Sequence, residues 1–276
     1  MHMNEFNGKT VFIPGGSSGI GLAAAQLLAA EGAHVVIFAR NMKRLEEATA
    51  GIKQNRKSDT QRIGFMTLDV SDNAAVKSTL TRAVSDFGTP DLLINCAGRA
   101  CPRNFEDISF AQFDETMRIN MYGIWNTCSV LIPFMKKRGG VIVNTSSMCG
   151  FLGVFGYTDY CASKFAIIGF SEALKSELKQ FKIAVQVLCP PDTDTPGFME
   201  ENKTKPEETK EISASAKLML PADVALVLLH DIGTGEFMII PNLDGKFTFI
   251  MKRLFPKLTE FVMDMSIKKV QKKRGV

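Results

Sequence analysis

Short apolar runs alternate with longer amphipathic stretches along most of this chain, and this alternation is what most restricts its fold. The apolar runs have the length of strands, whereas the stretches between them repeat apolar residues with the period of a helix. Strands joined through helices lie parallel, because each crossover must be long and right-handed, and the helices then cover both faces of the sheet. The predicted fold class is therefore α/β, a single doubly wound domain with a seven-stranded parallel sheet. The predicted strands are TVFI, HVVIFA, RIGFMTL, DLLIN, GVIVNTS, IAVQVLC and EFMII, and the predicted helices cover residues 20–30, 42–53, 74–87, 110–135, 157–181 and 221–232.

Charge is unevenly distributed along the chain. A chain of 276 residues with 45% hydrophobic and 22% charged residues is usual for a soluble globular protein. Residues 251–276 carry eight Lys and Arg against two acidic residues, so the first 250 residues sum to −2 of the net charge of +4. Two interpretations of this basic segment remain open, a solvated helix end or a surface that contacts anionic lipid. No nucleic-acid partner is expected.

The sequence offers few signs of a metal, a secretory signal or a membrane span. Its six cysteines are scattered without metal-ligand spacing, as in a cytosolic protein that keeps its thiols reduced. The segment MHMNEFNGKTVF lacks an apolar signal core, and no run approaches the roughly 20 apolar residues of a membrane span. We therefore expect a cytoplasmic protein without a metal site.

A glycine-rich turn, PGGSSGIG, follows the first predicted strand and opens the first predicted helix. Glycines at this place allow a tight turn and bring backbone amides close to a pyrophosphate at the helix N-terminus. Because the turn lies in the first βαβ unit, it predicts a Rossmann-type dinucleotide site. The residues of this turn predicted to bind the cofactor are Gly15, Ser17, Ser18, Gly19, Ile20 and Gly21.

The end of the second predicted strand indicates which dinucleotide binds. A site for NAD would place an acidic residue there to accept a hydrogen bond from the ribose 2′-hydroxyl. This chain has Arg40 instead, followed by Lys43 and Arg44. These cations favour a 2′-phosphate and hence NADP(H), although Arg40 as a plain surface charge is the alternative.

Two further strand ends are predicted to contact the cofactor. Open α/β sheets bind ligands at the carboxyl ends of their strands, and small residues there let the backbone approach a flat ligand. Asp69 and Val70 follow the third predicted strand, while Asn95, Ala97 and Gly98 follow the fourth.

Three residues after the fifth strand have the chemistry of a proton donor. Tyr160 and Lys164 are four residues apart in a predicted helix and so share one face, and Ser147 lies thirteen residues upstream of Tyr160. A phenol has an ordinary pKa near 10, and an adjacent ammonium is expected to lower it. Tyr160 would then act as a general acid, with Ser147 donating a hydrogen bond to a carbonyl oxygen.

With these motifs the chain resembles the short-chain dehydrogenase/reductase family up to about residue 240. The resemblance implies that Asn120, in RINMYG, completes a catalytic group with Ser147, Tyr160 and Lys164 and positions a water. It also implies that Tyr160 and Lys164 contact the cofactor, and that a homodimer or homotetramer forms through the helices containing Asn120 and Tyr160. One departure is Pro14, where a Thr usually braces the glycine turn.

The sixth predicted strand ends in CPPDTDTPGF, where the family usually carries Pro-Gly-x-x-x-Thr. The match implies that Pro190, Thr193 and Thr195 contact the cofactor, and the paired prolines stiffen the strand exit. This segment, with EENKTKPEET behind it, is similar to the 3-ketodihydrosphingosine reductase subgroup. The similarity implies that residues 198–220 form a mobile lid over a long-chain substrate.

The expected function is therefore NADPH-dependent reduction of the ketone of a long-chain amphipathic substrate, foremost 3-ketodihydrosphingosine to dihydrosphingosine. The alternatives are a reductase of 3-oxoacyl thioesters or steroid-like ketones, and a noncatalytic NADP-binding sensor. We expect a reductase domain over residues 1–245 and a basic appendage over 246–276.

The appendage has apolar residues on two faces of a predicted helix. Leu258, Phe261 and Met265 share one face, and Ile267 and Val270 lie on the opposite one. Eukaryotic members of the resembled subgroup carry hydrophobic anchors, which are not found in this sequence. Packing on the body or on a sister subunit and peripheral contact with a membrane surface are both open.

Overall fold

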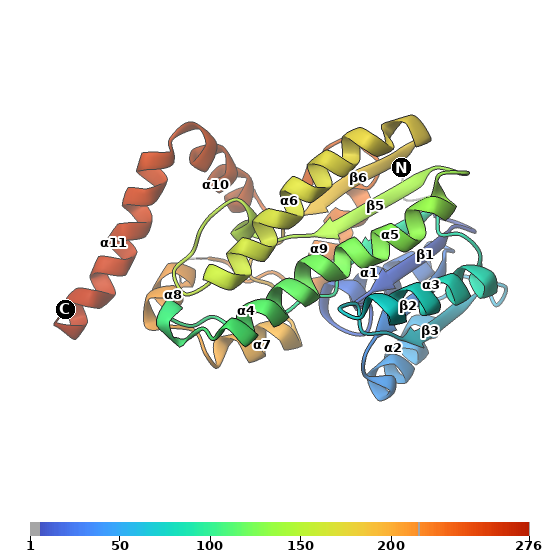
Figure 1. Cartoon of the computed structure of the whole chain (residues 1–276), viewed down its shortest axis with the longest axis horizontal. Coiled ribbons are helices and arrows are strands. Elements are labelled where there is room, and N and C mark those ends of the chain that lie inside the picture. The colour runs from blue at the N-terminus through green and yellow to red at the C-terminus, as the bar shows by residue number, and fades with distance from the viewer. Residues whose placement is uncertain (1–5, 215, 276) are drawn as a thin grey trace.

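A parallel sheet runs through the centre of the molecule, with strand order β3-β2-β1-β4-β5-β6-β7 (Figure 1). The structure is a computed structural model and describes residues 6–214 and 216–275. Neighbouring strands pair in parallel, which confirms the predicted doubly wound, seven-stranded sheet. The strands are β1 (Thr10–Pro14), β2 (His34–Ala39), β3 (Ile63–Thr67), β4 (Leu92–Asn95), β5 (Gly140–Thr145), β6 (Ile183–Leu188) and β7 (Met238–Ile239).

Helices cover both faces of this sheet, close to the stretches that the sequence predicts. They are α1 (Gly19–Ala30), α2 (Met42–Gln54), α3 (Asn73–Phe87), α4 (Phe110–Met117), α5 (Gly123–Met135), α6 (Thr158–Leu178) and α9 (Pro221–Asp231). Successive strand residues point to opposite faces, so Val11 and Ile13 of β1 join a core with α1, α2 and α9. Phe12 lies between them and joins a second core with α3, α5 and α6. Burial on both faces explains why the strands read as continuous apolar runs.

The order of the strands places a crevice at the ends of β1 and β4. The chain winds from β1 to β3 in one direction and from β4 to β7 in the other, so the crossovers leave the sheet on opposite sides beside β1 and β4. Ligands of open α/β sheets bind at such a switch point. The glycine turn after β1 and the NCAG turn after β4 meet there.

The segment after β6 leaves the sheet, and its two ends are paired with each other where it leaves and returns. Thr193 forms a parallel bridge with Met219, and the amide of Met219 donates to the carbonyl of Asp192 at 3.0 Å. Between these two points the chain forms α7 (Pro196–Asn202) and α8 (Glu207–Ser213). The predicted lid, residues 198–220, spans most of this excursion, and its Ser215 lies outside the described residues.

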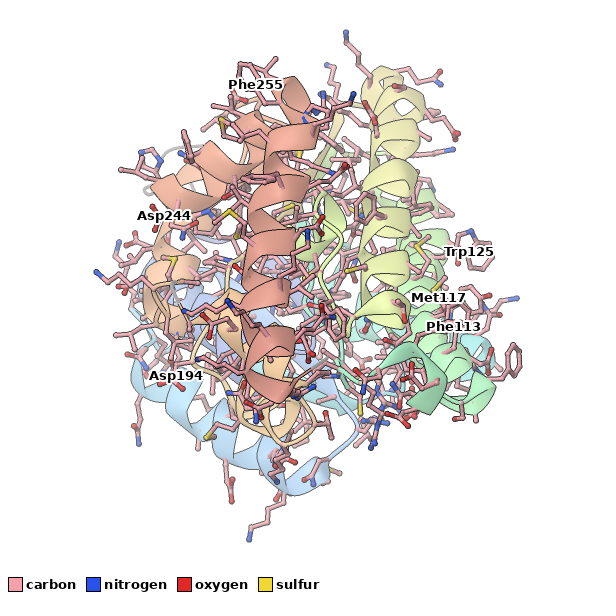
Figure 2. The ribbon with its side chains drawn as sticks, turned by 90° about the vertical axis from the view of Figure 1, so that its left-hand side faces the viewer. Phe113, Met117, Trp125, Asp194, Asp244 and Phe255 are labelled. Atoms are coloured by element: carbon pink, nitrogen blue, oxygen red, sulfur yellow. The ribbon has the colours of Figure 1, made fainter. Side chains whose placement is uncertain are left out.

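Two further helices, α10 (Leu243–Leu254) and α11 (Pro256–Arg274), form the C-terminal part of the chain. Figure 1 shows α11, in red, beyond α8 at one end of the molecule, and Figure 2 shows it lying across that end. Two ion pairs join α11 to α8, Lys269 to Glu211 at 2.5 Å and Arg274 to Glu208 at 3.0 Å. The C-terminal helix is thus attached to the predicted lid.

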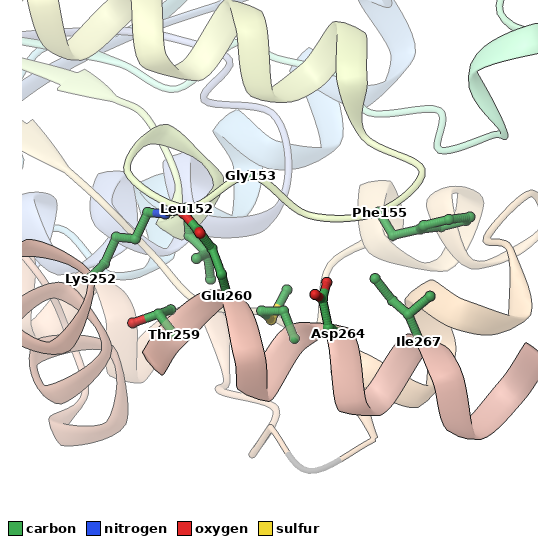
Figure 3. Close-up of a pocket in the computed structure, with 9 residues that line it drawn as sticks. Leu152, Gly153, Phe155, Lys252, Thr259, Glu260, Asp264 and Ile267 are labelled. Atoms are coloured by element: carbon green, nitrogen blue, oxygen red, sulfur yellow. Dashed lines mark hydrogen bonds and ion pairs between the residues drawn. The ribbon is translucent and has the colours of Figure 1, made fainter. Parts of the chain in front are cut away.

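The inward face of α11 contains the second apolar face that the sequence predicts. Ile267 lines a cavity of about 200 Å³ together with Leu152 and Phe155 from the loop after β5 (Figure 3), and Val270 is buried. Leu258, Phe261, Val262 and Met265 lie outward and are each about half exposed or more. Of the helices in residues 6–214 and 216–275, none has a stretch apolar and long enough to cross a bilayer.

Candidate active site

The glycine turn is packed against two other predicted parts of the site. Gly15 has φ +86°, and a Cβ there would fall 2.4 Å from the amide nitrogen of Ala97. Gly19 has φ +54°, and a Cβ there would fall 2.9 Å from Cγ2 of Thr195. Side chains at both glycines are therefore excluded by backbone conformation and by space. The turn, the exit of β4 and the segment after β6 thus come together in the structure.

The N-terminus of α1 has the features of an anion site. Ser18 is the N-cap residue, yet its side chain makes no capping hydrogen bond, and the first turn of α1 contains no acidic residue. The helix dipole and the amides at this end favour a negatively charged group. A cradle that glycine alone can form, at the start of an uncapped helix, fits a pyrophosphate.

Arg40 lies exposed after β2, on the same side of the sheet as Asp69 at the end of β3. Burial acts to raise the pKa of Asp69, but hydrogen bonds from Ser71 and the charges of Arg40 and Arg118 outweigh it and hold that pKa below its ordinary value. The Arg40 guanidinium therefore lies within electrostatic reach of Asp69. An arginine at this position can bind a phosphate group while Asp69 stays ionised.

Several predicted cofactor residues already make internal hydrogen bonds through their polar groups. The side chain of Asn95 donates to Asn144 and accepts from Thr127, both at 2.8 Å, so it joins β4 to β5 and α5. The carbonyl of Val70 accepts from Asn126 at 2.8 Å. These two residues brace the floor of the site, which leaves chiefly their neighbours Ala97 and Gly98 to face a ligand.

The segment after β6 is anchored in the same way. The carbonyl of Pro190 accepts from the amide of Met148 at 3.2 Å, which ties the strand exit to the turn that carries Ser147. The hydroxyl of Thr193 donates to the carbonyl of Pro191, and that of Thr195 caps α7 by accepting from the amide of Phe198 at 3.1 Å. Thr195 therefore holds the first lid helix against Gly19.

The structure brings Ser147, Tyr160 and Lys164 together beside β5. Tyr160 and Lys164 lie one turn apart on α6, with Lys164 Nζ 5.4 Å from the centroid of the Tyr160 ring and 2.9 Å from the carbonyl oxygen of Thr145, to which it donates. Ser147 precedes a short 3₁₀ turn, and its hydroxyl accepts from the amide of Cys149 at 3.1 Å. The Ser147 side chain also acts on the Tyr160 hydroxyl, whose pKa it lowers.

Asn120 lies in a π-helical turn, Arg118–Tyr122, that interrupts the helix predicted over residues 110–135. Its side chain is fully buried, accepts from the amide of Arg99 at 2.8 Å and donates to Ser163 at 2.9 Å. Gly98 lies beside it, since a Cβ there would be 3.4 Å from Asn120 Oδ1 and 3.6 Å from Lys164 Nζ. The side chain of Asn120 and the ammonium of Lys164 thus both lie beside Gly98, and π-bulges such as the one that carries Asn120 are frequent at functional sites.

The expectation that Lys164 lowers the pKa of Tyr160 is wrong for this arrangement. Burial raises the pKa of Tyr160 well above 10, Cys149 and Glu201 raise it further, and the hydrogen bond with Ser147 only partly opposes them. Lys164 is itself buried, and that burial lowers its pKa from 10.5 to about 8. Tyr160 consequently holds its proton at neutral pH, which suits a group that donates it.

Tyr157 is the second tyrosine of this segment, and it has Cys161 where Tyr160 has Lys164. It is 4% exposed, and its ring centroid lies 5.6 Å from that of Tyr160. Its hydroxyl donates to Glu201 of α7, and Glu201 in turn pairs with Lys205 at 3.1 Å. The sequence pattern predicts no role for Glu201 and Lys205, although both lie in the charged segment EENKTKPEET that follows the exit of β6.

Comparison with known proteins identifies the class to which this fold and site belong. A family model described as short chain dehydrogenase matches residues 9–206. The chain therefore belongs to the short-chain dehydrogenase/reductase family, and it is an oxidoreductase with a site for a nicotinamide dinucleotide.

Two curated relatives are similar to this chain over most of its length. The chain is 39% identical to the 3-dehydrosphinganine reductase of Danio rerio over 87% of this chain and 73% of that protein. It is 37% identical to the 3-ketodihydrosphingosine reductase of Dictyostelium discoideum over 93% of this chain and 80% of that protein. Among solved structures, a short chain dehydrogenase/reductase from Burkholderia phymatum in complex with NAD has a TM-score of 0.81 at 25% identity, covering 92% of this chain and 96% of that one.

Proposed function

We propose that this protein reduces 3-ketodihydrosphingosine to dihydrosphingosine with NADPH. The observation that carries the proposal is a buried, protonated Tyr160 beside Ser147 and Lys164, in a chain 37–39% identical to reductases of that ketone. Reduction adds a hydride to the carbonyl carbon and a proton to its oxygen, so the protein must supply a proton donor. Tyr160 keeps its proton at neutral pH and therefore has one to transfer.

Each residue of the site has a task in this proposal. Tyr160 donates its proton to the carbonyl oxygen, and Ser147 donates a hydrogen bond to the same oxygen, which polarises the carbonyl. Lys164 binds ribose hydroxyls of the dinucleotide, and Asn120 fixes the loop after β4 and positions a water. The developing negative charge on oxygen is thus matched by donors already in place.

The cofactor would be held by the elements described above. The glycine turn, from Gly15 to Gly21, and the N-terminus of α1 would hold the pyrophosphate. Asp69, Val70, Ala97, Gly98 and the segment Pro190–Thr195 would line the adenine and nicotinamide ends. NADPH supplies the hydride when it is bound. Arg40 provides the preference for the 2′-phosphate, because its planar cation can bind phosphate in a bidentate manner.

A panel of ketones with NADPH tests the proposal. Purified protein is mixed with 3-ketodihydrosphingosine, a 3-oxoacyl thioester or a cyclic steroid-like ketone, and NADPH absorbance and product mass are followed. We expect oxidation with 3-ketodihydrosphingosine, and dihydrosphingosine formed in equal amount. Turnover confined to the thioester would contradict the proposal, and the relative from Chlamydia muridarum, a 3-oxoacyl-[acyl-carrier-protein] reductase 35% identical over 71% of this chain, makes that outcome worth measuring.

We propose in addition that the chain forms a homodimer through α4, α5 and α6. Aromatic side chains that would be costly to leave in water lie exposed on these helices and on the π turn between α4 and α5, and Figure 2 shows Phe113 and Trp125 on the same side of the molecule. They are Phe110, Phe113, Tyr122, Trp125 and Phe165. Trp125→Glu should shift the protein to a monomer in sedimentation velocity, and an unchanged mass would contradict this interface.

The outward faces of α10 and α11 support a proposal of peripheral contact with an anionic membrane. Leu243, Phe247, Ile250 and Leu254 form one exposed stripe at helical spacing along α10, and the outward apolar residues of α11 are exposed as well. Lys246 of α10 and Lys257, Lys268 and Lys272 of α11 are exposed on the same two helices. Apolar burial in the interface and lysine attraction to anionic lipid act together in such helices.

Vesicle flotation tests this contact. The protein should float with vesicles that contain phosphatidylserine, less so at high salt, and Phe247→Glu should abolish flotation without lowering the unfolding midpoint. Thr248→Glu, on the same helix but partly buried off the stripe, adds the same charge as a control. Equal binding of Phe247→Glu and the wild type would contradict the contact.

A further inference from the structure

A group of charges lies where the lid meets the strand exit, outside the catalytic group described above. It consists of Glu201 from α7, Lys205 just after α7, and Asp192 from the strand exit. The ammonium of Lys205 lies 3.1 Å from Glu201 and 3.9 Å from Asp192, and its side chain is 2% exposed. The Glu201 side chain is 14% exposed. Lys205 and Glu201 are therefore largely withdrawn from water, whereas the Asp192 side chain is 31% exposed.

The charges in this group do not balance. Two carboxylates face one ammonium, which leaves a net charge of −1 when all three are ionised. Burial raises the pKa of Glu201 and the Asp192 charge adds to this, while the hydrogen bond from Tyr157 and the Lys205 charge act in the opposite direction without cancelling it. A second cation beside Glu201 would stabilise the carboxylate, because an opposite charge nearby favours the ionised form.

Glu201 lies close to the reacting centre. It accepts a hydrogen bond from Tyr157, whose ring adjoins that of Tyr160, and its charge acts on the pKa of the Tyr160 hydroxyl itself. The carboxylate is held in place from two sides, by Tyr157 on the body and by Lys205 on the lid. It is thus a fixed negative charge one side chain away from the proton donor.

We infer that Glu201 determines specificity by binding the ammonium group of a 2-amino ketone, so that the site selects ketones with a cation on the carbon next to the carbonyl. The inference rests on the proposed function and names the feature of the substrate that the site recognises. In a 2-amino ketone bound with its oxygen at Tyr160, the adjoining carbon carries the ammonium, and Tyr157 holds Glu201 beside Tyr160. A buried charge-assisted hydrogen bond would then add to the affinity.

Rates with two matched ketones test this role. 3-Ketodihydrosphingosine carries the ammonium, and its N-acetyl derivative has the same chain and ketone without the charge. The wild type should have a kcat/KM at least about tenfold higher for the amine. Glu201→Gln should lose about tenfold or more on the amine, mainly through KM, and change by no more than about threefold on the N-acetyl ketone. Gln keeps an acceptor for Tyr157 and leaves Lys205 paired with Asp192.

Glu200→Gln is the control, because Glu200 is the neighbouring residue, 70% exposed and paired with Lys203, and it should leave both rates unchanged. Equal losses on the two ketones in Glu201→Gln would show that Glu201 only latches the lid and would overturn the inference while leaving the proposed function intact. Equal wild-type rates for the two ketones would overturn it without any variant. No wild-type turnover of 3-ketodihydrosphingosine would overturn the proposed function and the inference together.

Discussion

Replacing Lys164 with methionine should change stability in a way that depends on pH. Lys164 is 4% exposed, and burial lowers its pKa from 10.5 to about 8. The difference of 2.5 units corresponds to a cost of about 3 kcal/mol for folding with this charge at pH 7. Between pH 8 and 10.5 the folded protein gives up this proton before the unfolded chain does, so the cost is relieved and wild-type stability rises with pH. Methionine has no charge, so the variant lacks this rise in stability with pH.

The assay is urea unfolding of both proteins, without cofactor, at pH 7 and pH 9.5. The free energy of unfolding of Lys164→Met, relative to the wild type, should fall by about 2 kcal/mol between these pH values. The lost hydrogen bond to Thr145 costs the variant about 1–3 kcal/mol at either pH, so the pH dependence decides the test and the absolute difference does not. Lys203→Met, at an exposed site, controls for general loss of positive charge. A relative stability that stays constant or rises with pH would refute the reasoning.

Two further substitutions test the cofactor site and the attachment of α11. Arg40→Asp should shift the selectivity in kcat/KM from NADPH toward NADH by at least about tenfold, or about 1.4 kcal/mol. The change removes a cation that can bind the 2′-phosphate and adds a carboxylate that can accept a hydrogen bond from the 2′-hydroxyl. Unchanged selectivity would show that Arg40 does not bind the 2′-phosphate. Arg274→Met should lower the free energy of unfolding by about 1–2 kcal/mol, because the Glu208 side chain is only 5% exposed and loses its partner. Lys269→Met, at the more exposed ion pair with Glu211, should lower it by less than about 1 kcal/mol. Equal losses in urea unfolding would show that burial of Glu208 is not what makes the first pair matter.

Local patterns in the sequence are sufficient to predict the sheet and the proximity of Tyr160 and Lys164. The strands are buried on both faces and so appear as apolar runs, and Tyr160 and Lys164 meet because four residues make about one helical turn. The tight turn at Gly15 and Gly19 can also be predicted from local sequence, because the turn itself requires glycine.

What the sequence could not predict depends on contacts between distant segments. Glu201 meets Tyr157 only because the excursion after β6 folds back over the site, and no spacing encodes that. The direction of the pKa shift of Tyr160 depends on burial, which the i, i+4 pattern does not reveal. A helical wheel shows two apolar faces on the C-terminal helix, but only its ion pairs with α8 decide which face lies inward.

A single-turnover measurement tests the central claim most directly, that Tyr160 donates the proton in reduction of 3-ketodihydrosphingosine. Protein loaded with NADPH is mixed rapidly with excess ketone, and the loss of NADPH absorbance is followed in the wild type, Tyr160→Phe and Tyr157→Phe. The account predicts one dihydrosphingosine per NADPH in the wild type, a rate at least about 100-fold lower in Tyr160→Phe with NADPH still bound, and a rate within about tenfold of wild type in Tyr157→Phe. A wild-type rate in Tyr160→Phe, or a stop in Tyr157→Phe alone, would contradict it.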